Sequence, residues 1–431
     1  MRSRFFLLLI VISSPALAVP GDWAWHGQTT FVEQYHPAFA SPYRGPNSLD
    51  PGSRGDETFD ATLFAGVRLW QGGEAYINPE IDQGFGLSDT IGVAGFPSGE
   101  AYKIGAASPY FRLQRLFFRQ TFDLGGEAGT IDPGANQLGG ARTADNLVIT
   151  AGKLSVTDIF DSNNLAHDPK NDFLNWSIID SGAFDYAADS WGYIYGIAGE
   201  WTQSWWTLRA GLFDMSRIPN DPALVRGFGQ YELVTEAEER HTLSGKAGTL
   251  KLLMFVNRGR MGDYRDAIMA GLVSHAIPST AAVRKPASRP GMAINLEQQL
   301  DDNLGVFARA SMNDGSKEAD EFSEINRSIT LGLSLKGADW GRTNDTIGVA
   351  GVINALSDSA RRYFAAGGIG ILIGDGRLPQ YGTEDIFETY YSAQVTDWLA
   401  ASADYQFIAN PAYNPQRGPV SVLGLRLHTQ F

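Results

Sequence analysis

The chain ends with Pro419-Val-Ser-Val-Leu-Gly-Leu-Arg-Leu-His-Thr-Gln-Phe431, in which side chains alternate between two faces. One face carries leucines and the terminal Phe431, and the other carries Arg426 and His428. The free carboxyl terminus of a soluble protein usually frays into water, so an aromatic residue there has little to pack against. In an outer-membrane barrel the last strand closes the ring, and its apolar face meets lipid. The terminal segment therefore predicts a transmembrane β-barrel.

The amino terminus predicts secretion. Residues 1–18 begin with two arginines, continue with a short apolar run and end in the small-residue motif Ala16-x-Ala18. This is the pattern of a signal peptide, with cleavage expected after Ala18. We therefore expect residues 19–431 to form a single outer-membrane domain.

Composition restricts the class of protein further. After the signal segment, no apolar run is long enough for a transmembrane helix. Cysteine is absent, and the 48 acidic residues outnumber the 34 basic ones, which does not suit a nucleic-acid partner. Asp158, Asp161 and Asp168 could bind calcium, but they lack EF-hand spacing. No nucleophile-elbow pattern occurs, so we expect neither an enzyme nor a bound cofactor.

Segments of period two recur along the mature chain and predict an all-β, antiparallel barrel of about sixteen strands. Tight turns such as Gln71-Gly72-Gly73 follow even-numbered strands, as expected when both termini lie at the periplasmic end. A strand at 364–374 would break this parity, so 357–383 is interpreted as an external loop with a short helix at 358–366. The expected strands are 23–35, 58–70, 74–82, 110–122, 146–156, 191–202, 204–213, 229–239, 247–257, 291–301, 304–313, 325–336, 345–356, 384–395, 398–408 and 419–431.

The long loop 157–190 is the strongest candidate for a segment that narrows the channel. Sixteen strands enclose a water-filled lumen, so selectivity depends on what occupies it. Asp168-Pro169 predicts a short helix that ends near Ile179. The apolar residues around Trp176 must be buried, either inside the barrel as a constriction or in an external lid. We expect the constriction.

The expected strand 110–122 places Arg115 and Arg119 on one face. An arginine that faces hydrocarbon costs about 2–4 kcal/mol near the midplane, so this face must look into the lumen. Glu80 shares the inward face of the neighbouring strand. Opposed charges either align polar solutes in a transverse field or pair to hold the wall together, and the sequence leaves both open. Further inward candidates are Asn295, Glu297, Arg309, Glu388 and Asp404.

Sugar recognition requires planar polar groups for hydroxyls and aromatic faces for the apolar side of the ring. The residues that could supply them are Glu80, Arg115, Asn175, Trp176, Asp185 and Tyr186. Aromatic residues such as Trp201 and Trp398 are better explained as the girdle at the membrane interface. The glycine-rich turn 124–145 has no feature that indicates a role.

Several segments carry a resemblance to a known family. They include 75–80 (AYINPE), 92–97 (GVAGFP), 115–121 (RLFFRQT), 158–161 (DIFD), 172–176 (DFLNW), 182–189 (GAFDYAAD), 262–267 (GDYRDA), 295–299 (NLEQQ) and 404–411 (DYQFIANP). On these segments the chain resembles the carbohydrate-selective porin family of the OprB type. The resemblance implies a channel for passive diffusion of monosaccharides such as glucose and of small oligosaccharides. It places Glu80, Arg115, Arg119 and the loop from Asp158 to Asn175 at the narrowest point.

Three functions remain open on the sequence. The first is a sugar-preferring channel in the Gram-negative outer membrane, in contact with its lipid and lipopolysaccharide. The second is a general or organic-anion-preferring channel that uses the arginine pair. The third is a secreted carbohydrate-binding or hydrolytic β-protein. A homotrimer is an expectation for a barrel of this size.

Overall fold

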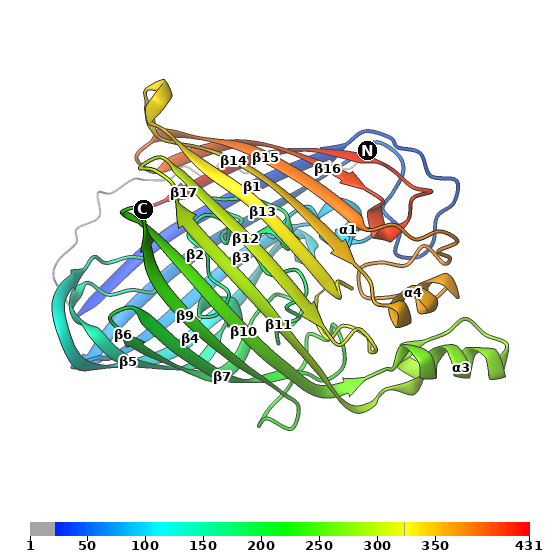
Figure 1. Cartoon of the computed structure of the whole chain (residues 1–431), viewed down its shortest axis with the longest axis horizontal. Coiled ribbons are helices and arrows are strands. Elements are labelled where there is room, and N and C mark those ends of the chain that lie inside the picture. The colour runs from blue at the N-terminus through cyan, green and yellow to red at the C-terminus, as the bar shows by residue number, and fades with distance from the viewer. Residues whose placement is uncertain (1–21, 103, 323) are drawn as a thin grey trace.

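The computed structural model describes residues 22–102, 104–322 and 324–431, so the signal peptide expected at 1–18 lies outside the described residues. Sixteen antiparallel strands of this part form one closed sheet (Figure 1). The strands are β1 (Trp23–His36), β2 (Arg54–Trp70), β3 (Gly73–Gly84), β4 (Ala106–Ile131), β5 (Gly140–Leu154), β6 (Ile194–Gln203), β7 (Trp206–Ser216), β9 (Tyr231–Leu243), β10 (Lys246–Met261), β11 (Lys285–Gln299), β12 (Leu304–Asn313), β13 (Arg327–Gly337), β14 (Arg342–Ala355), β15 (Glu384–Thr396), β16 (Leu399–Ala409) and β17 (Val420–Gln430). A further short strand, β8 (Leu224–Val225), pairs with β7.

Pairing of the first and last strands closes the barrel. β1 pairs with β17 from Gln28↔Gln430 to Tyr35↔Leu423, and each other strand of the ring pairs with its neighbours in the chain. Each of the sixteen expected strands corresponds to one strand of the ring. The predicted barrel is therefore confirmed.

The last strand shows why the ring has an apolar outside. Leu423 is 52% exposed, whereas Arg426 on the opposite face is 1% exposed. The backbone of Phe431 exchanges hydrogen bonds with Gly27, and its ring packs edge-on against Trp25 with centroids 6.0 Å apart. Exposed apolar residues alternate with buried polar ones because the outside meets lipid and the inside meets water and protein.

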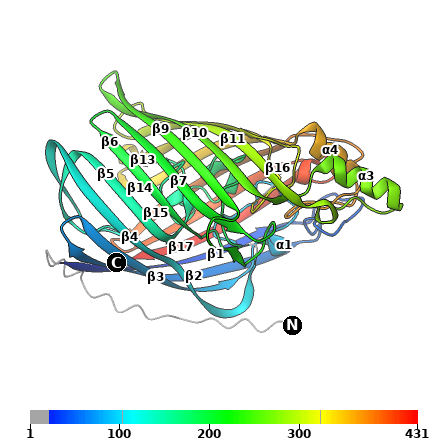
Figure 2. The same cartoon turned by 90° about the horizontal axis from the view of Figure 1, so that it is seen from below.

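The two ends of the barrel differ. Short connections such as 71–72, 204–205, 244–245 and 397–398 lie at one end, and the long segment 155–193 starts from the other. The helices are α1 (Leu87–Thr90), α2 (Trp176–Ile179), α3 (Tyr264–Ser274) and α4 (Asp358–Ala365), with short turns η1 (Val156–Asp158), η2 (Thr280–Val283), η3 (Ala338–Trp340) and η4 (Pro411–Tyr413). Figures 1 and 2 show α3 and α4 side by side beyond the strands at the long-loop end.

Two sequence predictions about helices have opposite outcomes. The helix expected at 358–366 is confirmed by α4, whose first turn is capped by Ser357. The helix expected from Asp168 to Ile179 is wrong except for its last turn, α2. A turn does form at Asp168, whose carbonyl accepts from the Asp172 amide at 2.7 Å, but it does not continue as a helix because the backbone amides of Leu174 and Asn175 donate to the Glu388 carboxylate of β15. Among the described residues, the helices are too short or too polar to cross a membrane.

Candidate functional site

Strand β4 brings three arginines to the inner face of the barrel. The register between β3 and β4 shifts between Asn78↔Arg115 and Pro79↔Leu113, so Gln114 is an extra residue. Such a bulge changes which face the following side chains take. Arg112 therefore points inward, although simple alternation from Arg115 would place it on the lipid side. The signal that could have found it is Pro79, because proline cannot donate to a sheet and often marks a bulge.

Arg112 and Arg115 bind carboxylates of the segment between β5 and β6. Arg112 lies 2.9 Å from Asp189, and its guanidinium carbon is 3.6 Å from the Trp191 ring centroid. Arg115 donates twice to Asp158, at 2.7 and 2.6 Å. A bidentate pair of this kind is stronger and more directional than a single contact. Both guanidinium charges are thus matched by carboxylates from one loop segment.

The geometry also explains the charge state of Asp158. Burial alone would raise the pKa of this carboxyl, but the Arg115 guanidinium outweighs burial and holds the pKa below its ordinary value. The pair therefore stays ionised near neutral pH. Its side chains remain partly exposed, at 17% for Arg115 and 28% for Asp158.

Arg119 binds a different segment, which reaches it from the other end of the barrel. It donates to the backbone carbonyl oxygen of Asn136 at 2.8 Å, and its guanidinium carbon lies 5.2 Å from the centroids of Tyr76 and Phe117. Asn136 belongs to the turn between β4 and β5, at the short-turn end of the barrel. The two arginines predicted as one pair thus meet two separate segments.

Glu80 lies within the wall beneath this site. Its carboxylate accepts hydrogen bonds from Thr62 at 2.6 Å, from Gln114 at 2.8 Å and from Tyr102 at 3.0 Å. The residue is only 2% exposed. Glu80 therefore organises neighbouring strands and offers almost no surface to a solute.

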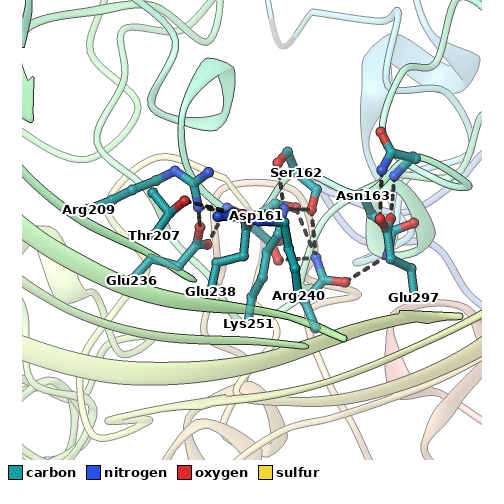
Figure 3. A network of polar contacts seen from close by, with 12 residues as sticks. Asp161, Ser162, Asn163, Thr207, Arg209, Glu236, Glu238, Arg240, Lys251 and Glu297 are labelled. Atoms are coloured by element: carbon teal, nitrogen blue, oxygen red, sulfur yellow. Dashed lines mark hydrogen bonds and ion pairs between the residues drawn. The ribbon is translucent and has the colours of Figure 1, made fainter. Parts of the chain in front are cut away.

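Further round the ring, strands β9 and β10 hold the same segment. Figure 3 shows Arg209 of β7 between Glu236, at 2.8 Å, and Glu238. Glu236 also accepts from the backbone amide of Asp161 at 2.8 Å. Lys251 donates to the Ser162 carbonyl at 2.5 Å. The charged network of the wall thus ends on backbone groups of the segment.

Further contacts extend around the ring. Arg309 of β12 donates to the carbonyls of Ile178 at 2.6 Å and Ala166 at 2.7 Å. Arg426 of β17 donates to the carbonyls of Pro169 and Asp172, both at 2.7 Å. The segment 155–193 starts between β5 and β6, yet it binds inward-facing side chains from β4 to β17.

The structure divides the nine predicted site residues into two groups by exposure. Four keep part of their surface accessible: Arg115, Arg119, Asp158 and Glu297. Five are buried: Glu80, Asn175, Trp176, Asp185 and Arg309. Trp176 stacks between Phe96 and Phe322, with centroids 5.0 and 4.6 Å away, and the carboxylate of Asp185 lies 2.5 Å from Arg289. Arg115 and Asp158 contact each other directly. Glu297 lies on the far wall, where it accepts a hydrogen bond from the Asn164 side chain of the segment at 2.6 Å.

An internal ion pair connects two parts of the segment. His167 Nδ1 lies 3.2 Å from Asp180 Oδ1. Burial alone would lower the pKa of His167, but the interaction with the nearby Asp180 carboxylate outweighs burial and raises the pKa to about 8. The imidazole is therefore mostly protonated at neutral pH and contributes to the shape of the segment.

Comparisons with known proteins agree with this architecture. The family model for the carbohydrate-selective porins of the OprB family matches residues 46–431. The high-pH structure of Pseudomonas putida OprB aligns with a TM-score of 0.71 at 17% identity, covering 96% of this chain and 94% of that one. The outer-membrane channel DcaP of Acinetobacter baumannii aligns with a TM-score of 0.51 at 10% identity, covering 95% and 97%. These likenesses to solved structures show the fold. Comparison with the curated proteins gives no match.

The family match covers most of the chain, and the fold agrees with it over nearly the whole length. The protein is therefore a porin of the Gram-negative outer membrane, and the chain belongs to the carbohydrate-selective OprB family.

Proposed function

We propose that this porin favours neutral carbohydrates, monosaccharides and small oligosaccharides, during passive diffusion into the periplasm. The observation that carries the proposal is the way in which arginines are presented on β4. Arg112 and Arg115 each combine a bound carboxylate with a nearby aromatic ring, Trp191 or Tyr193. Paired charges attract ions less than free ones, while their remaining polar atoms still hydrogen-bond hydroxyl groups.

We also propose that the segment 155–193 forms the constriction. Its support is the set of contacts that the segment makes with inward-facing side chains of strands from β4 to β17. A selectivity element must be held rigidly if weak contacts with a solute are to discriminate between solutes. In this proposal the exposed atoms of Arg115 and Asp158 lie at its edge, and the buried residues Asn175, Trp176, Asp185 and Arg309 hold it in place.

One observation favours a second candidate, a channel that prefers organic anions. Arg119 donates to a backbone carbonyl, which carries no formal charge to neutralise the guanidinium. A guanidinium in this state attracts carboxylates and other anions.

Liposome swelling separates the two candidates. Proteoliposomes are tested with glucose, its acid gluconate and an amino acid of smaller size. Sugar preference predicts that glucose enters faster than gluconate, and that Arg119→Gln leaves the glucose rate nearly unchanged. Faster entry of gluconate, lost in Arg119→Gln, would establish the second candidate. Entry rates that follow molecular size alone would reject both.

A further inference from the structure

The hairpin of β4 and β5 extends well beyond its neighbours. Gln120 pairs with Gly73, the first residue of β3, so the rest of β4 runs past the end of that strand. The pairing of β4 with β5 nevertheless continues to Ile131↔Gly140, with register shifts near Gly125. An arm, residues 124–145, therefore projects from the short-turn end of the ring.

The arm turns back toward the lumen. Gly125 and Gly126 have φ angles of 113° and 82°, a region that glycine adopts readily and other residues rarely do. Beyond this bend, the tip contacts residues that lie within the ring. Asn78 donates from its side-chain amide to the Asn136 side-chain oxygen at 2.8 Å, and Arg119 donates to the backbone carbonyl of the same residue.

Apolar packing holds the tip against the inner wall. Leu138 is buried in a small cluster with Tyr76 and Phe117, separate from the main core. The Leu138 backbone amide donates to the Tyr76 hydroxyl at 3.2 Å, and Arg68 donates to the Gly139 carbonyl at 2.9 Å. These partners belong to β2, β3 and β4, so the tip covers one side of the lumen.

The opposite side of the tip remains open to water. Gly134 and Gln137 exchange backbone hydrogen bonds, which places Ala135 and Asn136 at the extreme end of the turn. Ala135 and Gln137 are exposed although their neighbour Leu138 is buried. The tip thus has one face fixed to the wall and another that is accessible to water.

We propose that the β4–β5 arm is a second selectivity element, which narrows the channel at the short-turn end and presents amide groups to polar solutes. That end is periplasmic in barrels of this kind. A solute then passes two successive narrow regions along β4, one at Arg115 and one at Arg119. The inference rests on the protein being a channel and does not require a preference for sugars.

A single introduced thiol tests the position of the tip. The chain has no cysteine, so Ala135→Cys provides a unique site for a charged methanethiosulfonate reagent. Addition of the reagent should lower single-channel conductance in potassium chloride by about half, because bulk in a narrow path obstructs ions. Ser244→Cys, on the exposed β9–β10 turn at the same end, is the matched control and should show no change. Unchanged conductance after confirmed labelling of Ala135→Cys would overturn the proposal.

Shortening the arm gives an independent test. Asp123 pairs with Asn146, so residues 124–145 can be replaced by the two-residue turn Asn-Gly. Conductance should rise by about twofold because the exit is wider. A shortened channel that inserts with unchanged conductance would contradict the proposal. If this variant fails to insert, the thiol experiment decides. Both tests measure ion current, so they stay valid even if glucose and gluconate enter at equal rates.

Discussion

Arg115 and Arg119 lie on the same face of β4, yet the segments that bind them enter from opposite ends of the barrel. Asp158 of the long segment reaches Arg115, and Asn136 of the β4–β5 arm reaches Arg119. The long segment is bound by strands from β4 to β17, whereas the described contacts of the arm tip come from one wall. Two arginines on one strand thus bind different elements: Arg115 binds the long segment, which many strands hold, and Arg119 binds the arm, which is held more weakly. Regions with few buried contacts open at lower free-energy cost.

The largest expected effect comes from loosening the long segment. Arg309→Met with Arg426→Met removes buried charged donors from six carbonyls of the segment. We expect the free energy of unfolding to fall by about 3–6 kcal/mol. Hydrogen bonds from charged groups contribute about 1.5–3 kcal/mol each, and their contributions are not additive. The transition temperature of heat-modifiable gel mobility should fall, and open-channel current should become noisier. Arg258→Met, at an exposed position, is the control. Equal behaviour of the double variant and this control would contradict the role of Arg309 and Arg426 as anchors of the segment.

Weakening the arm should have a smaller and local effect. Leu138→Ala removes most of one side chain from the three-residue cluster and should cost about 2 kcal/mol at the tip. Hydrogen exchange in peptides that span 132–139 should accelerate about tenfold or more, since about 1.4 kcal/mol corresponds to tenfold. Leu243→Ala, at an exposed position near another short turn, should leave these peptides unchanged. Equal protection of the arm in both variants would show that the cluster does not hold it.

The long segment should also respond to pH through His167. Its pKa of about 8 lies above the ordinary value of 6.5. The pair with Asp180 therefore adds stability that is complete below pH 6.5 and is lost as pH rises through about 8, by at most about 2 kcal/mol. Thermal unfolding measured from pH 6 to 9 should show this decline, and His167→Gln should flatten it. A decline of the same size in the variant would assign it to other groups.

The smallest expected effect is on ion preference. It compares the charged partner of Arg115 with the uncharged partner of Arg119. Asp158→Asn leaves Arg115 without its bound carboxylate charge, so the reversal potential in a salt gradient should shift toward anions. The energy involved is below about 1 kcal/mol because the pair is partly exposed to water. Asn136→Ala keeps the backbone carbonyl that Arg119 binds and should shift the potential less. A larger shift of the reversal potential in Asn136→Ala than in Asp158→Asn would contradict this account of the two arginines.

The sequence was sufficient to predict the barrel because lipid outside and water inside impose a period of two on every strand. It also predicted α4, since Ser357 caps that helix locally. It failed where distant residues decide the backbone. The turn that begins at Asp168 stops before Leu174, whose amide is bound by Glu388 from more than two hundred residues away.

The site was predictable only in part for the same reason. Arg115 and Arg119 follow from the cost of exposing charge to lipid, but Arg112 depends on a bulge opposite Pro79. Glu80 was expected to meet solute, yet Thr62 and Gln114 from neighbouring strands surround its carboxylate. The arm 124–145 has glycines that permit a bend, and only the contacts of its tip show where the bend leads.

Planar-bilayer conductance with sugars as blockers is the most direct test of the central claim, that the narrowed lumen favours carbohydrates. Glucose and small oligosaccharides added at increasing concentration should reduce the ion current of the wild-type channel until the block saturates. A current that falls only in proportion to solution viscosity, as with a polyol of matched size, would contradict carbohydrate preference.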